Sequence, residues 1–369
     1  MKNNKLRNSE NGLSIINFIL VIVIILAGLF VYYMVKGETE ISSSETNAIY
    51  VSDNTNIKVN TKKYETSNKN NNELLSNNII NDNEQENTEI NYKKFFYTQL
   101  SKNAKTMYDT MMNNIESLRS GNGTIEFDID EKGVENEFQS AWDAITMDHP
   151  EVFYIDTTKL SLKTQTVTTF FGAKVTYKYI LEPAYDLTYY AKEFDTEEKV
   201  TSSINNVEKI ANSVIKNANG TTYDKVKYIH DYIINNTSYD ENDTPNNGNI
   251  YGTLINHEAV CEGYAETMKY LLDKLSIPCV IVYGNGIKED ESSEYHSWNY
   301  VKMDDNKWYA IDATWDDPIV IGNGILPKEE NYRYFLKGSN DFSSTHVEVH
   351  DVSGTGQNFK YPEISEKNY

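Results

Sequence analysis

Hydrophobic positions divide this chain into an apolar run, a polar stretch and an amphipathic remainder. Residues 18–35 read FILVIVIILAGLFVYYMV and contain no charged side chain. Extended back to Leu13, the run reaches the roughly 20 residues that a helix needs to cross about 30 Å of hydrocarbon. The pattern therefore predicts a transmembrane helix at residues 13–35.

Charges on either side of this run predict its orientation. Lys2, Lys5 and Arg7 precede it, whereas the first charges after Lys36 are acidic. Positive charge collects on the cytoplasmic side of membrane-spanning helices. We therefore expect residues 1–12 in the cytoplasm and the rest of the chain outside, as the extracytoplasmic domain of a single-pass protein of the cell membrane.

Two other interpretations of the apolar run remain open. A cleaved signal peptide would have a shorter apolar core, of about 7–15 residues, and a small-residue cleavage site, and the run fits neither condition well. The segment from Gly12 to Asn17 resembles the type IV prepilin signal, in which processing follows a glycine and the apolar helix is retained. That family has a glutamate where this sequence has Asn17, so we favour the uncleaved anchor.

A polar stretch follows the run at residues 36–91. It is rich in Asn, Ser, Thr, Glu and Lys and has few apolar residues. Such a segment cannot bury enough apolar surface to offset the entropy lost on ordering. It predicts a disordered tether between the membrane and a globular part.

Periodic apolar positions begin near Tyr92 and predict a mixed α+β fold. We expect an N-terminal α/β region at residues 92–220 and a catalytic core with its tail at residues 221–369. Helical spacing predicts helices over residues 94–118, 135–147, 196–216, 222–234 and 261–275. Short apolar or alternating runs predict strands over residues 153–155, 166–171, 174–181, 279–283, 296–303 and 307–314.

The charge and cysteine content of the chain argue against several classes of protein. The chain has 34 Lys+Arg against 55 Asp+Glu, a formal net charge of −21. This balance argues against nucleic acid or an anionic lipid surface as the main partner, because both require clustered basic residues. Only two cysteines occur, Cys261 and Cys279, so a disulfide scaffold is not expected.

Three residues in the core carry candidate chemistry. Cys261 opens a predicted helix, and His296 and Asp312 lie on successive predicted strands. Dipole and free N–H groups at a helix N-terminus stabilise a thiolate. A histidine can then accept and return the proton, and a carboxylate can fix the histidine's tautomer and orientation.

Strand register tests this interpretation. A three-residue loop at residues 304–306 would pair Met303 with Lys307 and bring Asp312 to the same face as His296, diagonally one pair away. A two-residue turn would send Asp312 to the other face. The last loop residue is an asparagine, which suits the left-handed position that such loops use.

Each of the three residues also has a purely structural explanation. Cys261 could be a buried packing residue, because free cysteine is among the most buried residue types. His296 could be a strand histidine with satisfied hydrogen bonds, and Asp312 could cap a turn. Their agreement in order, context and face favours a catalytic triad.

Several stretches resemble the transglutaminase-like superfamily. The correspondence extends from about residue 225 to about residue 346, and the segment DHPEVFY at residues 148–154 resembles the region before the core in exported bacterial members. Within the core the similar motifs are AVCEGYA at 259–265, YLLDKLSIP at 270–278, YHSWNYV at 295–301, WYAIDATWDDP at 308–318, and the tail YFLKGS at 334–339 with STH at 344–346.

This resemblance implies a papain-like fold, in which a helix bearing the cysteine packs on an antiparallel sheet bearing the histidine and the aspartate. It also implies that Cys261 is the nucleophile, His296 the general base and acid, and Asp312 the residue that orients His296. Active members of the superfamily form an acyl-enzyme by attacking a carbonyl with the thiolate. They differ in whether water or an amine then accepts the acyl group.

Together these observations predict a membrane-anchored extracytoplasmic enzyme that acts on amide bonds of surface protein or peptidoglycan peptide. It would work as a protease or amidase, or as a cross-linking acyltransferase, with no cofactor. The alternatives are a catalytically silent surface-binding module of the same fold and a pilin-like envelope module.

Several other residues near these motifs are weaker candidates for a functional role. The backbone N–H of Cys261 is an expected oxyanion donor, and Tyr251 is either a second donor or a packed loop residue. His346 and His350 are spaced by four on a probable strand, without an evident third ligand, so no metal is expected. The acidic cluster at residues 289–294 is most simply a solvated loop that borders the cleft.

Overall fold

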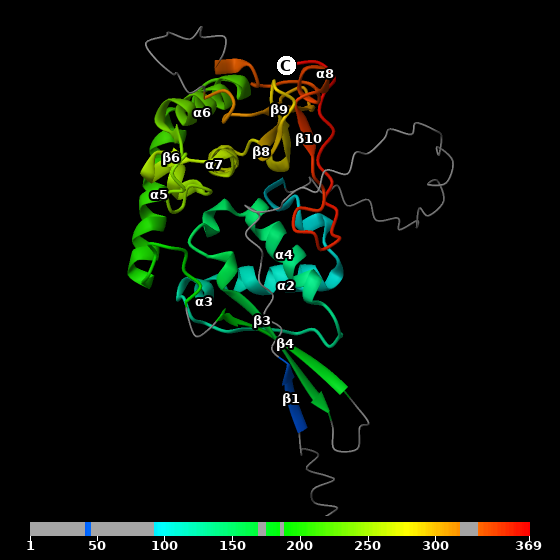
Figure 1. The fold of residues 1–369 in the computed structure, drawn as a ribbon. Helices are drawn as coiled ribbons and strands as arrows, with labels where there is room; N and C mark the ends of the chain where they lie inside the picture. Colours follow the sequence, from blue (N-terminus) through cyan, green and yellow to red (C-terminus); the bar gives the residue numbers. More distant parts are fainter. Residues whose placement is uncertain (1–40, 46–91, 169–174, 185–187, 318–330) are drawn as a thin grey trace, which may run out of the picture.

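The computed structural model describes residues 41–45, 92–168, 175–184, 188–317 and 331–369 (Figure 1). Residues 13–35, for which the sequence predicts a membrane anchor, and most of the predicted tether lie outside these ranges. Within the described ranges, no helix is both long enough and apolar enough to cross a membrane.

The C-terminal half is built on a four-stranded antiparallel sheet in the order β10-β7-β8-β9. Helix α7 packs against this sheet, and α5 and α6 pack beside α7 (Figure 1). The strands are β7 Cys279–Ile287, β8 Ser293–Lys302, β9 Trp308–Ile311 and β10 His346–Glu348, and the helices are α5 Glu197–Asn217, α6 Thr222–Asn236 and α7 Cys261–Lys274.

The spacing of apolar residues explains why helix α7 forms and which face it buries. Tyr264, Met268, Leu271 and Leu272 recur on one face and are all buried. The helix ends where Ser276 adopts a positive φ of 58°, just before the buried strand that the sequence predicts. The N-terminus of α7 is therefore fixed against the sheet.

The two preceding helices begin at side-chain caps. Thr221 and Asp224 form a reciprocal capping box at the start of α6. The Thr196 side chain accepts a hydrogen bond from the Lys199 N–H at the start of α5. Both helices lie where the sequence predicts them.

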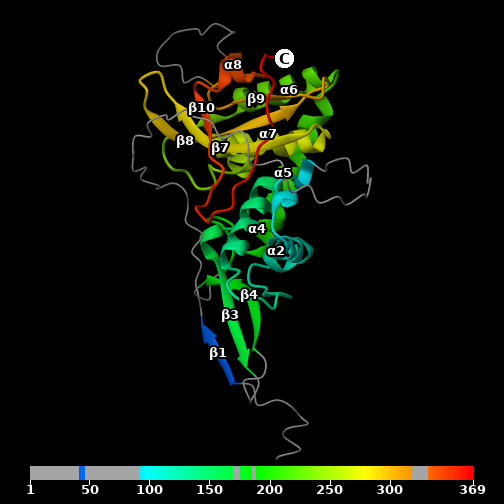
Figure 2. The same ribbon diagram turned by 90° about the vertical axis from the view of Figure 1, so that its right-hand side faces the viewer.

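The N-terminal region lies at the other end of the molecule, where its β3-β4 hairpin points away from the core (Figures 1 and 2). Its sheet has the order β1-β3-β4-β2. The elements are β1 Ile41–Glu45, α2 Lys102–Asn113, α3 Ile115–Arg119, β2 Ile125–Phe127, α4 Glu135–Asp148, β3 Leu160–Thr168 and β4 Val175–Pro183.

Short elements complete the described chain. They are the 3₁₀ turns Tyr92–Lys94, Tyr97–Gln99, Pro150–Val152 and Thr157–Lys159, the parallel strands β5 Ser238–Tyr239 and β6 Glu258–Ala259, a π-helical turn Gly252–Asn256, and α8 Ser339–Phe342.

The single helix predicted over residues 94–118 is wrong. Asp148 accepts hydrogen bonds from the backbone N–H groups of Phe96 and Tyr97, at 3.0 and 2.9 Å, and these residues lie in and beside a 3₁₀ turn. Ser101 then caps α2 by accepting a hydrogen bond from the Ala104 N–H. Side-chain capping therefore overrides a continuous apolar pattern.

Two strand predictions also need correction. Residues 153–155 contribute one isolated bridge, Ile155 to Tyr190, rather than a strand. Strand β3 begins at Leu160, earlier than predicted, and pairs with β4 through Thr168 and Val175. Residues 169–174, between these two strands, lie outside the described residues.

Part of the predicted tether is a strand. Residues 41–45 form β1, which pairs antiparallel with β3 from Ile41–Thr168 to Glu45–Thr164. This departs from the prediction of disorder over the whole of residues 36–91. Backbone pairing at a sheet edge requires no apolar side chains, so composition does not reveal it.

The C-terminal tail ties the two halves together. The Ser353 hydroxyl donates a hydrogen bond to Asp143 on α4, and Phe359 packs edge-on against Phe96 with ring centroids 5.4 Å apart. The buried apolar side chains of both halves form one continuous core. Residues 92–220 thus complete the packing of the C-terminal half; the domain boundary at residue 220 stays a prediction.

Candidate active site

Cys261 is the first residue of α7, and its side chain is half-buried. The loop before α7 approaches the first helical turn closely. A Cβ on Gly263 would lie 2.6 Å from the carbonyl oxygen of Asn247, so the position excludes a side chain. The glycine two residues after Cys261 lets this loop pack against the N-terminus of the helix.

His296 and Asp312 lie together beside this helix end. His296 Nε2 is 2.7 Å from Asp312 Oδ2, and the two residues are 2% and 0% exposed. The loop between their strands has three residues, as predicted: the Met303 N–H donates to the Lys307 carbonyl, and Asn306 has a φ of 63°. The structure therefore brings all three sequence-predicted residues into one site.

The predicted strand pairing of Asp312 is wrong in one respect. The β8–β9 ladder ends at Asn299 and Ile311, one residue before the aspartate. Asp312 instead begins a turn, and its Oδ1 accepts hydrogen bonds from the N–H groups of Thr314 and Trp315, at 3.0 and 3.1 Å. A self-capped turn, rather than a strand pair, orients the carboxylate.

The three side chains are electrostatically coupled. Burial opposes a charge on His296, but the charge of Asp312, together with hydrogen bonds to Asp312 and Cys261, raises the pKa of His296 to about 10. Burial likewise opposes the charge of Asp312, but the charge and hydrogen bonds of His296 and His346 hold the pKa of its carboxyl below the ordinary value. The site therefore favours a charged His296 imidazolium beside the Asp312 carboxylate.

His296 uses its two ring nitrogens for different partners. Nε2 faces Asp312, which leaves Nδ1 as the ring nitrogen available to the Cys261 side chain. This arrangement fixes the ring so that the nitrogen beside the sulfur can exchange a proton with it.

His346 joins the site, although sequence reasoning gave it no chemical role. Its Nε2 lies 3.0 Å from Oδ2 of Asp312, the oxygen that also contacts His296. The side chain is fully buried and stacks on Phe342, with centroids 3.8 Å apart. The only available signal was its place in the STH tail motif, since its contact partner lies 34 residues away in the sequence.

The same site has three side chains of the types that bind metals, and their ligand-type atoms lie within 4.8 Å of one another: His296, Asp312 and His346. Hydrogen bonding accounts for this proximity. Both nitrogens that face Asp312 lie at donor distance from one carboxylate oxygen, and the charged form favoured for His296 has no lone pair for a cation. The sequence shows no third ligand for His346, whereas the fold places His296 and Asp312 beside it.

A second buried histidine–aspartate pair holds the turn that follows Asp312. His230 Nε2 on α6 is 3.1 Å from Asp316 Oδ2, and both side chains are fully buried. The other carboxylate oxygen accepts the Tyr334 N–H at 2.7 Å. Because Asp316 follows Asp312 by four residues, this pair anchors the turn that presents Asp312.

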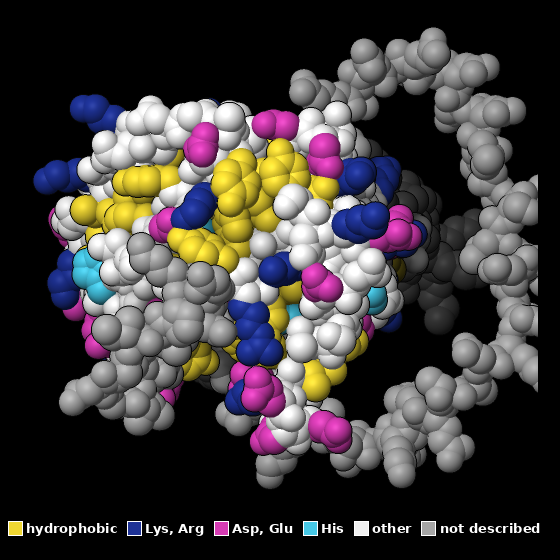
Figure 3. All heavy atoms as spheres, turned by 90° about the horizontal axis from the view of Figure 1, so that it is seen from above, with side chains coloured by type: hydrophobic (Ala, Val, Ile, Leu, Met, Phe, Trp, Pro, Cys, Tyr) yellow, Lys and Arg dark blue, Asp and Glu magenta, His cyan; other side chains and the backbone are white. Residues whose placement is uncertain are grey.

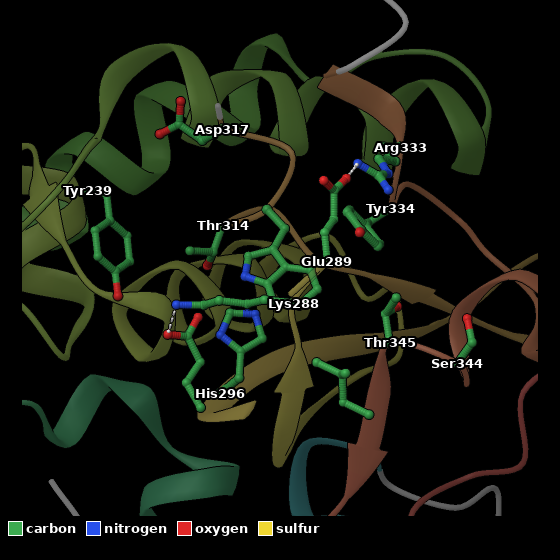
Figure 4. A pocket seen from close by; sticks show the side chains of 13 residues that line it. Tyr239, Lys288, Glu289, His296, Thr314, Asp317, Arg333, Tyr334, Ser344 and Thr345 are labelled. Carbon is green, nitrogen blue, oxygen red and sulfur yellow. Dashed lines mark hydrogen bonds and ion pairs between the residues drawn. The ribbon is translucent and has the colours of Figure 1, made fainter. Parts of the chain in front are cut away.

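A cavity of about 550 Å³ opens beside His296. Figure 4 shows Lys288 extending past the His296 ring, with Tyr239 on one side and Thr345 on the other. The remaining wall is formed by Ile287, Glu289, Glu294, Thr314, Trp315, Asp317, Arg333, Tyr334 and Ser344.

The lysine and the arginine on the cavity wall are each paired with an acidic side chain. Lys288 Nζ lies 2.5 Å from Glu294, and Arg333 lies 3.5 Å from Glu289 (Figure 4). The acidic cluster therefore borders the cavity as the sequence predicts. Seen from the end that carries α6 and α8, the surface shows hydrophobic side chains interspersed with both signs of charge (Figure 3).

Other predicted candidates have structural roles. Tyr251 stacks on Phe153 at 5.8 Å and meets Phe194 edge-on at 5.0 Å, which fits the packed-loop alternative. Cys279 is fully buried, and burial raises the pKa of its thiol above the ordinary value. His350 contacts the Phe359 carbonyl in the tail.

Comparison with known proteins identifies the core. Residues 208–313 match the family model of the transglutaminase-like superfamily. This segment is a transglutaminase-like domain, and it includes Cys261, His296 and Asp312. No curated protein matches the chain.

Solved structures with a partial likeness include proteins of different kinds. A crystal structure of a TGase is 19% identical, with 56% of this chain and 53% of that chain covered and a TM-score of 0.29. The periplasmic domain of TgpA from Pseudomonas aeruginosa, bound to ethylmercury, is 14% identical, with coverages of 38% and 56% and a TM-score of 0.24. Menin is 17% identical, with coverages of 37% and 28% and a TM-score of 0.23. The chain thus spans about half the length of the first of these.

Proposed function

We propose that this chain is a thiol acyl-transfer enzyme that attacks amide bonds through an acyl-enzyme on Cys261. The observation that carries the proposal is the arrangement of three side chains. Cys261 begins helix α7, its side chain contributes to the raised pKa of His296, and His296 Nε2 lies 2.7 Å from the buried carboxylate of Asp312. Such an arrangement activates a sulfur nucleophile.

The chemical sequence follows from the positions of the protons. The Cys261 thiolate adds to the amide carbonyl carbon, and the carbonyl electrons move to oxygen. The backbone N–H of Cys261 is an oxyanion donor in this proposal. When the tetrahedral intermediate collapses, the C–N bond breaks, the leaving amine takes a proton from the His296 imidazolium, and a thioester remains.

Deacylation reverses the role of His296. Neutral His296 removes a proton from the incoming water or amine, which attacks the thioester carbon. Collapse expels the Cys261 thiolate and leaves His296 protonated. Asp312 keeps its charge throughout and fixes the tautomer and direction of the ring.

The finer proposal concerns location and substrate. The apolar run at residues 13–35 and the charges around it support a membrane anchor with the catalytic domain outside the cell. At that location the available amides belong to surface proteins and peptidoglycan peptides. Labelling of intact cells with a membrane-impermeant maleimide tests the location. Modification of Cys261 only after cell lysis would contradict it.

One experiment separates the two acyl acceptors. Full-length protein is incubated with glutamine-containing protein or cell-wall peptide and a labelled primary amine, and the Cys261→Ser variant is the control. Covalent incorporation of label indicates transfer to an amine, and release of ammonia or free peptide without incorporation indicates hydrolysis. If the wild-type protein forms no thioester with any such substrate, the enzyme proposal is wrong and the silent binding module replaces it.

A further inference from the structure

Asp312 carries two imidazole donors on one oxygen. His296 Nε2 and His346 Nε2 lie 2.7 and 3.0 Å from Asp312 Oδ2. The second donor comes from an independent element, because His346 opens β10 at one edge of the sheet and Asp312 follows β9 at the other edge. Chain proximity therefore does not explain the contact.

The His346 ring is held in a buried aromatic enclosure. It stacks on Phe342, with centroids 3.8 Å apart, and lies 4.7 and 4.9 Å from the rings of Trp315 and Trp298. The Thr345 hydroxyl lies 2.8 Å from the Nδ1 atom of His346 and also contacts the Phe342 carbonyl oxygen, at 3.1 Å. Both ring nitrogens thus have fixed partners, and the ring has no freedom to turn away from Asp312.

The carboxylate of Asp312 is saturated by these contacts. Oδ1 accepts two backbone N–H groups of its own turn, and Oδ2 lies within hydrogen-bond distance of both imidazoles. Without His346, a single donor would hold Oδ2 in a site that excludes water. The carboxylate could then tilt about the turn and weaken its hold on His296.

We propose that His346 is a positioning residue of this active site, whose Nε2–H fixes Asp312 so that the carboxylate keeps His296 aligned on Cys261. The proposal rests on the proposed function. It adds a fourth side chain to the triad, one that acts through Asp312 and does not touch the substrate. A glutamine side chain can place an N–H near the same point, whereas a leucine cannot.

The test uses the full-length chain and the second-order rate constant for alkylation of Cys261 by iodoacetamide. Variants are His346→Leu, His346→Gln and the matched control His350→Leu, whose histidine contacts the tail and not the triad. Near pH 6.5 we expect His346→Leu to slow alkylation about tenfold, the size that loss of one hydrogen bond to a charged group produces. His346→Gln and His350→Leu should stay within about threefold of wild type.

A second measurement covers the case in which His346→Leu fails to fold. In wild-type protein labelled with ¹⁵N-histidine, long-range ¹H–¹⁵N correlation spectra report the tautomer of each ring. The proposal requires His346 to carry its proton on Nε2. A ring protonated only on Nδ1 would overturn it, because Nε2 could then not donate to Asp312.

The outcomes distinguish the two proposals. If wild-type alkylation is fast and depends on His296 but His346→Leu is unchanged, the positioning role is wrong and the enzyme proposal stands. Equal slowing in the Leu and Gln variants would mean that ring packing matters and not the donor, which also overturns the role. If wild-type alkylation is indifferent to His296→Ala, the enzyme proposal itself fails.

Discussion

The Nε2 atom of His296 lies 2.7 Å from Oδ2 of Asp312, in a place where both side chains are almost completely shielded from water. A charged pair in such a place persists only when its remaining hydrogen-bonding groups are satisfied. Here the second carboxylate oxygen is held by two backbone N–H groups, and the Cys261 side chain contributes to the raised pKa of His296. The contact orients His296, the candidate base. It also makes the stability of the fold and the reactivity of the site depend on the protonation state of His296.

The first prediction concerns the pH dependence of stability. The pKa of His296 is raised to about 10 in the folded protein, against about 6.5 for an unperturbed histidine. Its stabilising contribution is therefore fully present below pH 6.5 and is lost as the pH rises toward 10. The difference in free energy of unfolding between wild type and His296→Gln should be constant at pH 5–6 and shrink at higher pH. Urea unfolding at several pH values measures it, and a difference that grows with pH would contradict this linkage.

The second prediction concerns Asp312→Asn. The amide keeps the shape of the side chain but can present an N–H to His296, and this favours the wrong ring tautomer. In a serine hydrolase triad the same exchange lowers turnover by about 10⁴-fold, and we expect a large loss of acyl-enzyme formation here. Intact-mass measurement of the thioester follows the loss, and circular dichroism checks the fold. Wild-type rates in this variant would remove Asp312 from the mechanism.

Third, Gly263→Ala should destabilise the protein. The added Cβ would lie 2.6 Å from the Asn247 carbonyl oxygen and 2.9 Å from Ala259 Cβ. These contacts belong to the backbone and to a short side chain, so they cannot simply swing away, and overpacking of this kind costs about 1–3 kcal/mol. Gly248→Ala is the matched control, because its Cβ would meet only the flexible Glu262 carboxylate, at 3.3 Å. Equal unfolding midpoints for the two variants would contradict the close-approach argument.

The fourth prediction concerns the contact between the N-terminal region and the core. Asp148 accepts the N–H groups of Phe96 and Tyr97 and the hydroxyl of Tyr108. Asp148→Ala leaves buried donors without a partner and should lower the free energy of unfolding by about 2 kcal/mol or more. Asp156→Ala, which removes an exposed cap at Thr158, should cost less. The prediction fails if denaturant titrations show the two variants to be equally stable.

The local parts of the fold were accessible from the sequence because short-range rules govern them. Cys261 at a helix start and the three-residue loop ending in Asn306 both follow from neighbouring residues. The family resemblance added the order of the motifs, and the match at residues 208–313 confirms the resemblance over those residues. The roles of the three site residues stay predictions until they are tested chemically.

What the sequence could not predict depends on contacts between distant segments. His346 reaches Asp312 only because the sheet order brings β10 beside β7. The helix predicted over residues 94–118 is interrupted because Asp148, some fifty positions away, captures the turn around Phe96. Periodicity within one segment carries no information about such partners.

The most direct test of the account is the rate of Cys261 alkylation against pH in the full-length protein, with Cys261→Ser and His296→Ala as controls. The account predicts fast alkylation that persists well below pH 8 and is lost in His296→Ala, as expected of an assembled thiolate–imidazolium pair. Alkylation that rises only near pH 8.5, as for an unactivated thiol, and is unchanged in His296→Ala would contradict it.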